Sequence, residues 1–478
     1  MYVYLVFSIL IGHCLAQSKP PFCPPCSCKT VEQTKFEVTC DQDVRDKLFQ
    51  ESSWIDSTNK TFPYKALLVH NMPILTLDKK FPISNVSYLS LANNSIVNIT
   101  DSIFSNLQDM ITLDLSYNNI EQIHPDAFDG QYLINEFRPL KSLKNLHLDH
   151  NRISSLNQDV FEHTPNVEIL TISHNPLDKI DQQTLVAITG LVFLKHLDLS
   201  YTGLSSLPDA FLHTPRYLEK LDLSGNQFNR IPKTLGDSHS LSVLYFNNNP
   251  IVSLAEENGF PKIPTLKILH LSGMRKLLNI TSRALSNLEN LEELFCYDNP
   301  ELTHIDKDAL SAKRDGAEYE TWPSIKKLYL QDNKLSYIDM QLILQWKDLT
   351  ELDLTNNPWT CECENQWIVD ELMPIYLRLD DQKAKRLRCG APIEMVALTF
   401  YDVYKKETTM RCLDLYGHRP ERDGALLVGI LAGVLITIPV VLFLIYAYQR
   451  HWFGLFDNSP AGFSRQFYKK TTSEDGPF

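Results

Sequence analysis

Apolar residues recur along most of this chain in one spacing, LxxLxLxxNxL, in which x is a variable and mostly polar position. Examples begin at Leu143 (LKNLHLDHNRI), Leu218 (LEKLDLSGNQF) and Leu349 (LTELDLTNNPW). Two leucines one residue apart point to the same side of an extended segment, so each unit predicts a short β-strand with one buried face. A single unit cannot bury that face alone, so the period indicates stacked repeats.

The asparagine of the pattern marks eleven units, most of them 23 to 27 residues apart: Asn94, Asn118, Asn151, Asn175, Thr202, Asn226, Asn249, Met274, Asn299, Asn333 and Asn357. An asparagine amide donates and accepts hydrogen bonds, so it can pair with backbone groups where the chain leaves the strand. Thr202 keeps part of this capacity and Met274 has none, so we expect a local irregularity near Met274. Extra residues from Gly130 and from Ser311 should protrude on the outer, non-strand side.

This spacing is the leucine-rich repeat signature. It predicts an α/β solenoid, a horseshoe whose concave face is a parallel β-sheet, over residues 63–357. A solenoid exposes its core at both ends, so capping units are expected before and after the repeats.

Two apolar segments lie outside the repeats. The first, MYVYLVFSILIGHCLAQ, predicts a secretory signal peptide over residues 1–16. The alternative is that residues 1–16 form a membrane anchor. This segment has only about a dozen apolar residues, whereas spanning a bilayer takes about 20. Residues 424–448 carry no charge and are long enough for a transmembrane helix. We therefore expect a single-pass plasma-membrane protein with residues 17–423 outside the cell and a short cytoplasmic tail, 449–478.

Small residues recur at every fourth position of this predicted helix: Ala425, Gly429, Gly433 and Thr437. In a helix they share one face and allow two backbones to approach closely. The pattern predicts a homodimer contact in the membrane, although small residues are also frequent in membrane helices in general.

The ten cysteines are grouped at the two ends of the repeats. Cys14 falls in the signal peptide, and Cys296 occupies an inward leucine position, which predicts a buried free thiol. The other eight favour disulfides in an oxidising compartment. The alternatives are a zinc site, which lacks histidines at ligand spacing, and a thioredoxin-like CPPC pair, which lacks a βαβ unit. The eight are Cys23, Cys26, Cys28, Cys40, Cys361, Cys363, Cys389 and Cys412.

The first four cysteines, in the spacing C-x2-C-x-C-x11-C, resemble the N-terminal cap of extracellular leucine-rich repeat proteins. NPWTCECENQW, with the two later cysteines, resembles their C-terminal cap. The resemblance places the caps at 17–62 and 358–413, with a stalk at 414–423. The plan is similar to single-span proteins of the neuronal adhesion and Toll-related groups, without the intracellular Toll signalling domain. It implies the disulfides Cys23–Cys28, Cys26–Cys40, Cys361–Cys389 and Cys363–Cys412.

The residue between the two leucines of each LxL strand should face the concave surface, where ligands of such solenoids bind. In chain order this column reads Ser90, Asp114, His147, Thr171, Asp198, Asp222, Tyr245, His270, Phe295, Tyr329 and Asp353. Aromatic rings at a surface without a packing need predict an anchor for a protein ligand. Alternatively, strands simply favour aromatic residues. The predicted ligand-binding residues are Tyr245, His270, Phe295, Tyr297 and Tyr329.

Asp114, Asp198 and Asp222 line the other half of the column. Paired carboxylates can support acid–base chemistry or bind a cation, but in this repeat type they are interpreted as solvated strand residues. No nucleophile elbow, HExxH motif or phosphate loop occurs. The sequence therefore predicts neither an enzyme nor a metal or cofactor site.

The formal net charge of −13 argues against a nucleic-acid partner. We expect a cell-surface receptor or adhesion molecule that binds a protein ligand. The alternative is an innate-immune co-receptor for microbial ligands that signals through a partner. Five glycosylation sequons agree with an extracellular location: Asn59, Asn85, Asn93, Asn98 and Asn279.

Overall fold

The structure is a computed structural model that describes residues 20–31, 35–56, 58–134, 136–313, 320–412 and 420–450. The predicted signal peptide, most of the stalk and the tail beyond residue 450 lie outside these ranges. Two compact units are distinguished, 1–361 with 365–408 and 362–364 with 409–478, and each is described by itself.

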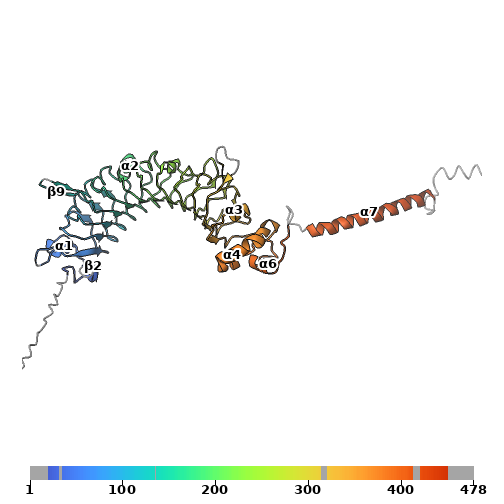
Figure 1. Cartoon of the computed structure of the whole chain (residues 1–478), viewed down its shortest axis with the longest axis horizontal. Helices are drawn as coiled ribbons and strands as arrows, with labels where there is room; N and C mark the ends of the chain where they lie inside the picture. Colours follow the sequence, from blue (N-terminus) through green and yellow to red (C-terminus); the bar gives the residue numbers. More distant parts are fainter. Residues whose placement is uncertain are drawn as a thin grey trace, which may run out of the picture. The chain divides into compact units, whose positions relative to one another are not determined.

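The first unit is built on one 14-stranded sheet (Figure 1). The first two strands, β1 and β2, pair antiparallel, and all the other neighbouring strands pair in parallel. Register is kept from strand to strand, because each repeat contributes the same three-residue segment. The strands are β1 (Ser27–Val31), β2 (Lys35–Cys40), β3 (Tyr64–Val69), β5 (Tyr88–Ser90), β7 (Thr112–Asp114), β11 (Asn145–His147), β12 (Ile169–Thr171), β13 (His196–Asp198), β14 (Lys220–Asp222), β15 (Val243–Tyr245), β17 (Ile268–His270), β19 (Glu293–Phe295), β23 (Lys327–Tyr329) and β24 (Glu351–Asp353).

Leucine at the middle of every repeat strand forms the inner layer of the core, and none of these leucines is more than 4% exposed. A second layer contains a row of stacked phenylalanines in successive repeats, with ring centroids 5.7 to 6.2 Å apart. The row consists of Phe81, Phe104, Phe128 and Phe161. Burial of this continuous apolar surface holds the repeats together, which confirms the predicted solenoid.

The asparagine of each repeat joins its own turn to the preceding one. Asn226 is typical. Its Nδ2 donates to the carbonyls of Leu199 (2.9 Å) and Leu223 (3.0 Å), and its Oδ1 accepts from the N–H of Leu204 (3.0 Å). Thr202 also fits the scheme, because its hydroxyl donates to the Leu199 carbonyl (2.7 Å). Buried backbone groups at the turn are thereby satisfied.

The irregularity expected at Met274 affects hydrogen bonding but leaves the strand register intact. Asn299 Oδ1 accepts from the N–H of Met274 itself (2.8 Å), whereas in regular repeats the N–H two residues further on is the donor. The same shift recurs one repeat later, where Asn333 Oδ1 accepts from the N–H of Asn299 (2.9 Å). Met274 is fully buried, so an apolar side chain replaces the missing amide there.

The outer side of the repeats carries short elements (Figure 1). These are the strand groups β4 (Thr76–Leu77), β6 (Asn98–Ile99), β8 (Gln122–Ile123) and β16 (Ser253–Leu254), β18 (Asn279–Ile280), β20 (His304–Ile305), together with α2 (Gln182–Thr189), a 3-10 turn (Lys233–Asp237) and α3 (Gln341–Leu344). The two insertions form antiparallel pairs separate from the main sheet, as expected for protruding segments. They are β9 (Gln131–Leu133) with β10 (Glu136–Arg138), and β21 (Ala312–Lys313) with β22 (Glu320–Thr321).

The N-terminal cap covers the first repeat strand with β1 and β2, followed by α1 (Arg45–Leu48) and a 3-10 turn (Glu51–Ser53). Its core is an aromatic cluster in which the fully buried Trp54 meets Phe22 and Tyr64 edge-on, at 5.6 and 5.7 Å. The implied disulfides Cys23–Cys28 and Cys26–Cys40 are confirmed.

The C-terminal cap is helical, and the implied disulfides Cys361–Cys389 and Cys363–Cys412 are confirmed. Trp359 is fully buried and its indole N–H donates to the Leu354 carbonyl (2.8 Å), while Tyr376 Oη accepts from the Leu354 N–H (3.3 Å). The segment NPWTCECENQW, in which Trp359 and Trp367 flank Cys361 and Cys363, is thus an end cover for the solenoid. Its helices are a 3-10 turn (Cys363–Asn365), a π-helical turn (Ile368–Leu372), α4 (Met373–Leu379), α5 (Asp381–Arg386) and α6 (Phe400–Lys405).

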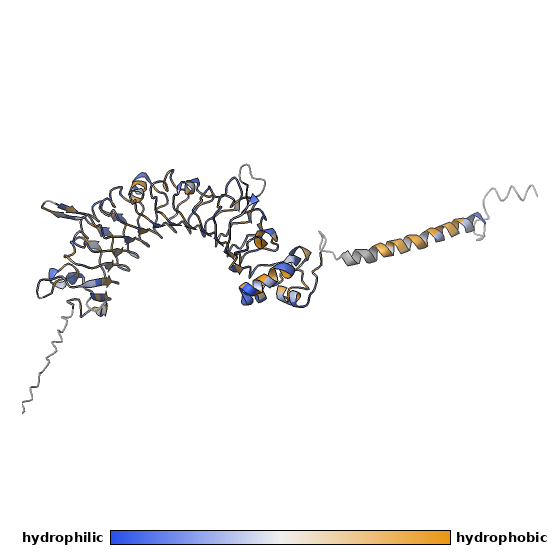
Figure 2. Ribbon diagram, in the orientation of Figure 1, coloured by the Kyte–Doolittle hydropathy of each residue, from blue (hydrophilic) through white to orange (hydrophobic). Residues whose placement is uncertain are grey.

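The second unit contains one long helix, α7 (Pro420–Gln449). Its segment Leu427–Gln449 is long and apolar enough to cross a membrane, judged by length and composition (Figure 2). Gly429 and Gly433 lie on this helix with open space around the position of an added Cβ. Self-association through this face remains a prediction.

Candidate ligand-binding surface

The concave column predicted from the sequence is present as one row. Strand pairing sets its members opposite one another from Ser90 to Asp353, each as the last residue of its strand. Within this row, four rings in neighbouring repeats stack face to face. Their centroids are 4.3, 4.3 and 4.8 Å apart and their planes lie within 13° of parallel. We call Tyr245, His270, Phe295 and Tyr329 the ring stack.

Stacking leaves the ring edges as the part of the ring stack that faces solvent. All four residues are half-buried, and the flanking strand positions Val243 and Ile268 are also half-buried and apolar. Together they form an aromatic and aliphatic patch on the sheet. Ring edges carry a positive quadrupole component, so the patch favours aromatic faces, carbonyl oxygens and aliphatic groups of a partner.

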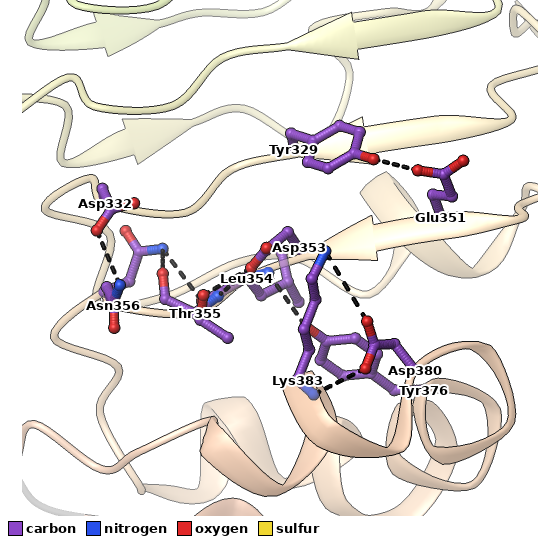
Figure 3. Close-up of polar contacts among 11 residues, drawn as sticks. Tyr329, Asp332, Glu351, Asp353, Leu354, Thr355, Asn356, Tyr376, Asp380 and Lys383 are labelled. Atoms are coloured by element: carbon purple, nitrogen blue, oxygen red, sulfur yellow. Dashed lines mark hydrogen bonds and ion pairs between the residues drawn. The ribbon is translucent and has the colours of Figure 1, made fainter.

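A lysine ammonium covers each end of the ring stack. Lys220 Nζ lies 4.9 Å from the Tyr245 ring centroid, and Lys383 Nζ lies 5.3 Å from that of Tyr329. Lys383 comes from α5 of the C-terminal cap and also pairs with Asp353 at 3.0 Å (Figure 3). The cap therefore fixes the last ring by a cation–π contact as well as closing the core.

Charged groups beside the ring stack are mutually paired. Lys327 Nζ lies 3.3 Å from a carboxylate oxygen of Glu293 and 3.4 Å from one of Glu351. The Tyr329 hydroxyl donates to Glu351, which lowers the pKa of this carboxyl group, and burial first of all raises the pKa of Tyr329 (Figure 3). Glu351 is therefore ionised and Tyr329 protonated at neutral pH.

The imidazole of His270 is neutral at physiological pH. Burial between Tyr245 and Phe295, followed by the charge of Lys220, lowers the pKa of His270 to about 4. The ring stack is thus an uncharged aromatic surface. Tyr297, the fifth predicted ligand residue, lies in the turn after β19, and its N–H donates to Ser272 Oγ (3.3 Å). It belongs to the turn and not to the ring stack.

The aspartates of the column have a backbone role. Asp114, Asp198, Asp222 and Asp353 each accept, through Oδ1, the N–H of the residue two positions on, at 2.9 to 3.0 Å. In the repeats of His270 and Phe295, a side chain of the preceding repeat replaces the carboxylate. Asn247 Oδ1 accepts from the N–H of Ser272 (2.8 Å) in the His270 repeat. Rings are tolerated there because this donor remains paired.

A second row of rings was missed in the sequence. Each of its members directly precedes the asparagine position of its repeat. The backbone φ of these four ring residues is +52° to +54°. The sequence signal was present, since the four residues share one register in the repeat. They are Tyr117, His150, His174 and Tyr201.

The predicted modification sites divide by exposure. Asn59, Asn85, Asn93 and Asn98 are exposed, whereas Asn279 is half-buried in β18 and its Oδ1 is buried without a hydrogen-bond partner. Four of the five sequons precede residue 100, so the strands that carry the ring stack have none. Cys296 is buried and free as predicted, and burial raises the pKa of its thiol to about 12.

The repeats and their caps define the class of protein. A leucine rich repeat family model matches residues 84–132, 141–195 and 193–251. Lumican of Coturnix japonica is 30% identical over 285 residues, which cover 55% of this chain and 77% of Lumican. The chain belongs to the leucine-rich repeat family.

Other similarities cover smaller shares. Transforming growth factor beta activator LRRC33 of Danio rerio is 27% identical over 194 residues, which cover 41% of this chain and 27% of that protein. Among solved structures, the APL1 leucine-rich repeat domain aligns over 64% of this chain and 86% of its own, at 19% identity and a TM-score of 0.41.

Proposed function

We propose that this protein is a cell-surface receptor or adhesion molecule that binds a protein ligand through the ring stack on its concave sheet. The observation that carries the proposal is the stack itself. Four rings in adjacent repeats are held parallel, with their edges toward solvent and apolar Val243 and Ile268 beside them. Rigid aromatic surface of this kind lowers the entropy cost of binding.

Two further features support a protein ligand, and a third supports a location at the cell surface. The neighbouring charges are already paired within the chain, so they form a polar rim around an uncharged centre. The ring-bearing strands carry no sequon, which leaves this part of the sheet open to a large partner. The apolar segment of α7 would anchor the protein in the plasma membrane as a single-pass receptor, with the repeats outside the cell.

Binding, rather than catalysis, is proposed because the column aspartates are used by the backbone. The experiment displays the full chain on cells and screens it against arrayed, tagged extracellular proteins, including microbial surface components. A microbial ligand would favour the co-receptor alternative. Bound candidates are retested against His270→Ala with Phe295→Ala, which should weaken binding at least about tenfold, or 1.4 kcal/mol.

A matched control is available on another face. Phe193 and Tyr217 are also exposed and stacked, at 5.9 Å, but lie outside the repeat strands. Phe193→Ala with Tyr217→Ala removes similar ring area and should leave binding unchanged. The amount of each variant at the cell surface is measured through an epitope tag. Phe295→Leu removes the aromatic ring but keeps a large apolar side chain at this position. Equal binding by wild type and the ring-stack variant, at equal surface level, would refute the proposal.

A further inference from the structure

The second row of rings lies along the turns that follow the repeat strands. Its four members stack in succession, with centroids 4.1, 4.0 and 4.5 Å apart and planes within 13° of parallel. Tyr117 and Tyr201 are 52% and 45% exposed. The next repeat has Gly225 at this position, and a Cβ there would lie 2.3 Å from the Tyr201 ring. We call Tyr117, His150, His174 and Tyr201 the edge ring row.

A row of carboxylates runs along the adjoining strands. Asp198 and Asp222 are register partners in β13 and β14. The repeat before them has Thr171 in the column, and Asp149 places its carboxylate there by accepting from the Thr171 hydroxyl and from the N–H of Ser173 (2.9 Å). Three successive repeats therefore each present a carboxylate, about 4.8 Å apart across the sheet. We call Asp149, Asp198 and Asp222 the acidic strip.

The acidic strip is not neutralised by the chain. Elsewhere carboxylates have cation partners: Glu168 pairs with two lysines at 2.6 and 2.8 Å, and Asp353 pairs with Lys383. Within the residues that the structure describes, no lysine or arginine forms such a pair with the strip. Lys220, in the same strand as Asp222, is directed over the Tyr245 ring. One oxygen of Asp198 and one of Asp222 accept backbone N–H groups, which leaves the second oxygen for a partner.

The edge ring row borders the strip without cancelling its charge. Burial, followed by the nearby His150, lowers the pKa of His174, and the charges of Asp198 and Asp149 oppose this shift only in part. The pKa of His196, which faces Asp198 and Asp149 from within the sheet, is also lowered, by burial and then by Lys220. Both imidazoles are therefore neutral at pH 7 and add no positive charge beside the strip. Within the strip, burial raises the pKa of Asp222, and hydrogen bonds from Ser224 oppose that shift.

We propose that the acidic strip and the edge ring row together bind a lysine- or arginine-rich segment of an extracellular protein. Carboxylates in a row match an extended chain that carries several cations, and a guanidinium group can pair with two carboxylate oxygens at once. A single metal ion fits less well because it needs oxygens that converge on one point. No metal-binding group of three acidic, histidine or cysteine residues is present in the described part of the chain. This surface lies in earlier repeats than the ring stack.

The test uses full-length protein in detergent micelles and the biotinylated peptides nona-arginine and nona-glutamate. Binding is measured by biolayer interferometry at low and high NaCl concentration. Nona-arginine should bind and nona-glutamate should not, and the affinity should fall with salt. Asp198→Asn with Asp222→Asn keeps the Oδ1 acceptors for the backbone and removes two charges. This variant should lose at least about tenfold in affinity, which corresponds to 1.4 kcal/mol.

The matched control removes two charges from carboxylates that are already paired. Glu292 contacts Lys267 and Lys326, and Glu301 contacts Lys334. Glu292→Gln with Glu301→Gln should change affinity less than about twofold. Tyr201→Ala should weaken nona-arginine binding without altering the unfolding temperature of the repeats by more than the control. Equal weakening by both double variants would show attraction to net charge alone and would overturn the proposal, as would failure of nona-arginine to bind at low salt.

Discussion

Asn226 Oδ1 accepts a hydrogen bond from the N–H of Thr202 at 3.1 Å, one repeat earlier. The Thr202 hydroxyl, which donates to the Leu199 carbonyl, also lies 3.1 Å from this oxygen. The same oxygen also serves the N–H of Leu204. One buried amide oxygen therefore pairs with two backbone N–H groups of the neighbouring repeat, where regular repeats use one.

Asn226→Leu should be among the most destabilising single changes in the repeats. It keeps the branched side-chain shape but leaves two buried N–H groups without their acceptor and the Leu199 and Leu223 carbonyls with fewer partners, so we expect a loss of about 3 kcal/mol or more in unfolding free energy. Urea unfolding followed by circular dichroism measures it. Asn290→Leu removes one exposed bond to the Pro264 carbonyl and should cost less than about 1 kcal/mol. Similar losses for the two variants would contradict the role of Asn226.

Lys383→Met should loosen the C-terminal cap. The change keeps a long apolar side chain but removes the ammonium group, which pairs with the mostly buried Asp353 and lies over the Tyr329 ring. We expect a loss of about 2 kcal/mol, because Asp353 remains as a buried carboxylate without its cation. Lys385→Met removes the exposed pair with Asp381 on the same helix and should destabilise the protein clearly less than Lys383→Met. Thermal unfolding of the two variants compares the pairs directly.

Acidification should destabilise the repeats partly through His270. Its folded-state pKa of about 4 lies below the unfolded value of 6.5, so the unfolded chain binds more protons between these pH values. This contribution is fully present above pH 6.5 and is lost as the pH falls from 6.5 through 4. His270→Phe continues the ring stack without a titrating group, so its unfolding free energy should fall less between pH 7 and pH 4.5.

Cys296 should resist alkylation in the native protein. Its thiol is fully buried, its pKa is raised to about 12, and Asn299 Nδ2 lies 3.4 Å from its sulfur. Thiolate is the reactive form, so maleimide should label this residue only after unfolding in urea. Mass spectrometry of the labelled peptide reads the result. Rapid labelling without denaturant, or a disulfide at this position, would show that the site is open.

Cys363→Ser should retain the protein in the secretory pathway. The change breaks the bond to Cys412, and loss of a native disulfide from a small cap typically costs about 2–5 kcal/mol. Surface staining of an epitope-tagged chain should fall strongly for this variant. Cys296→Ala removes a sulfur but no disulfide, so its surface level should stay close to wild type. Normal export of Cys363→Ser would mean that the cap is stable without this bond.

The sequence was sufficient for features that depend on local spacing. The leucine pair fixed the strands, and the position between the leucines correctly located Tyr245, His270, Phe295 and Tyr329 in one row. This rule does not cover Tyr297, which lies beyond the strand and follows the turn, and its part in ligand binding stays a prediction. Contacts from distant segments could not be derived. Lys383 reaches Tyr329 from a cap helix more than fifty residues later, and no spacing rule places it there.

The edge ring row was not predicted from the sequence for a different reason. Tyr117, His150, His174 and Tyr201 are mixed in chemistry, and their stacking depends on a left-handed backbone at the residue before each asparagine. That conformation is uncommon outside glycine, asparagine and aspartate. It becomes evident only when the turn geometry is known, although the shared register was visible in the sequence.

The direction of the asparagine bonds has a consequence for biosynthesis. Each amide serves the turn made before it, so a newly translated repeat leaves the ribosome with acceptors and donors that only its successor can satisfy. After Asn357 there is no successor, and the Trp359 indole and the Tyr376 hydroxyl take its place at Leu354. The last translated segment therefore closes the nascent solenoid. A chain released early from the ribosome would expose unsatisfied hydrogen-bonding groups at its end, which chaperones would recognise.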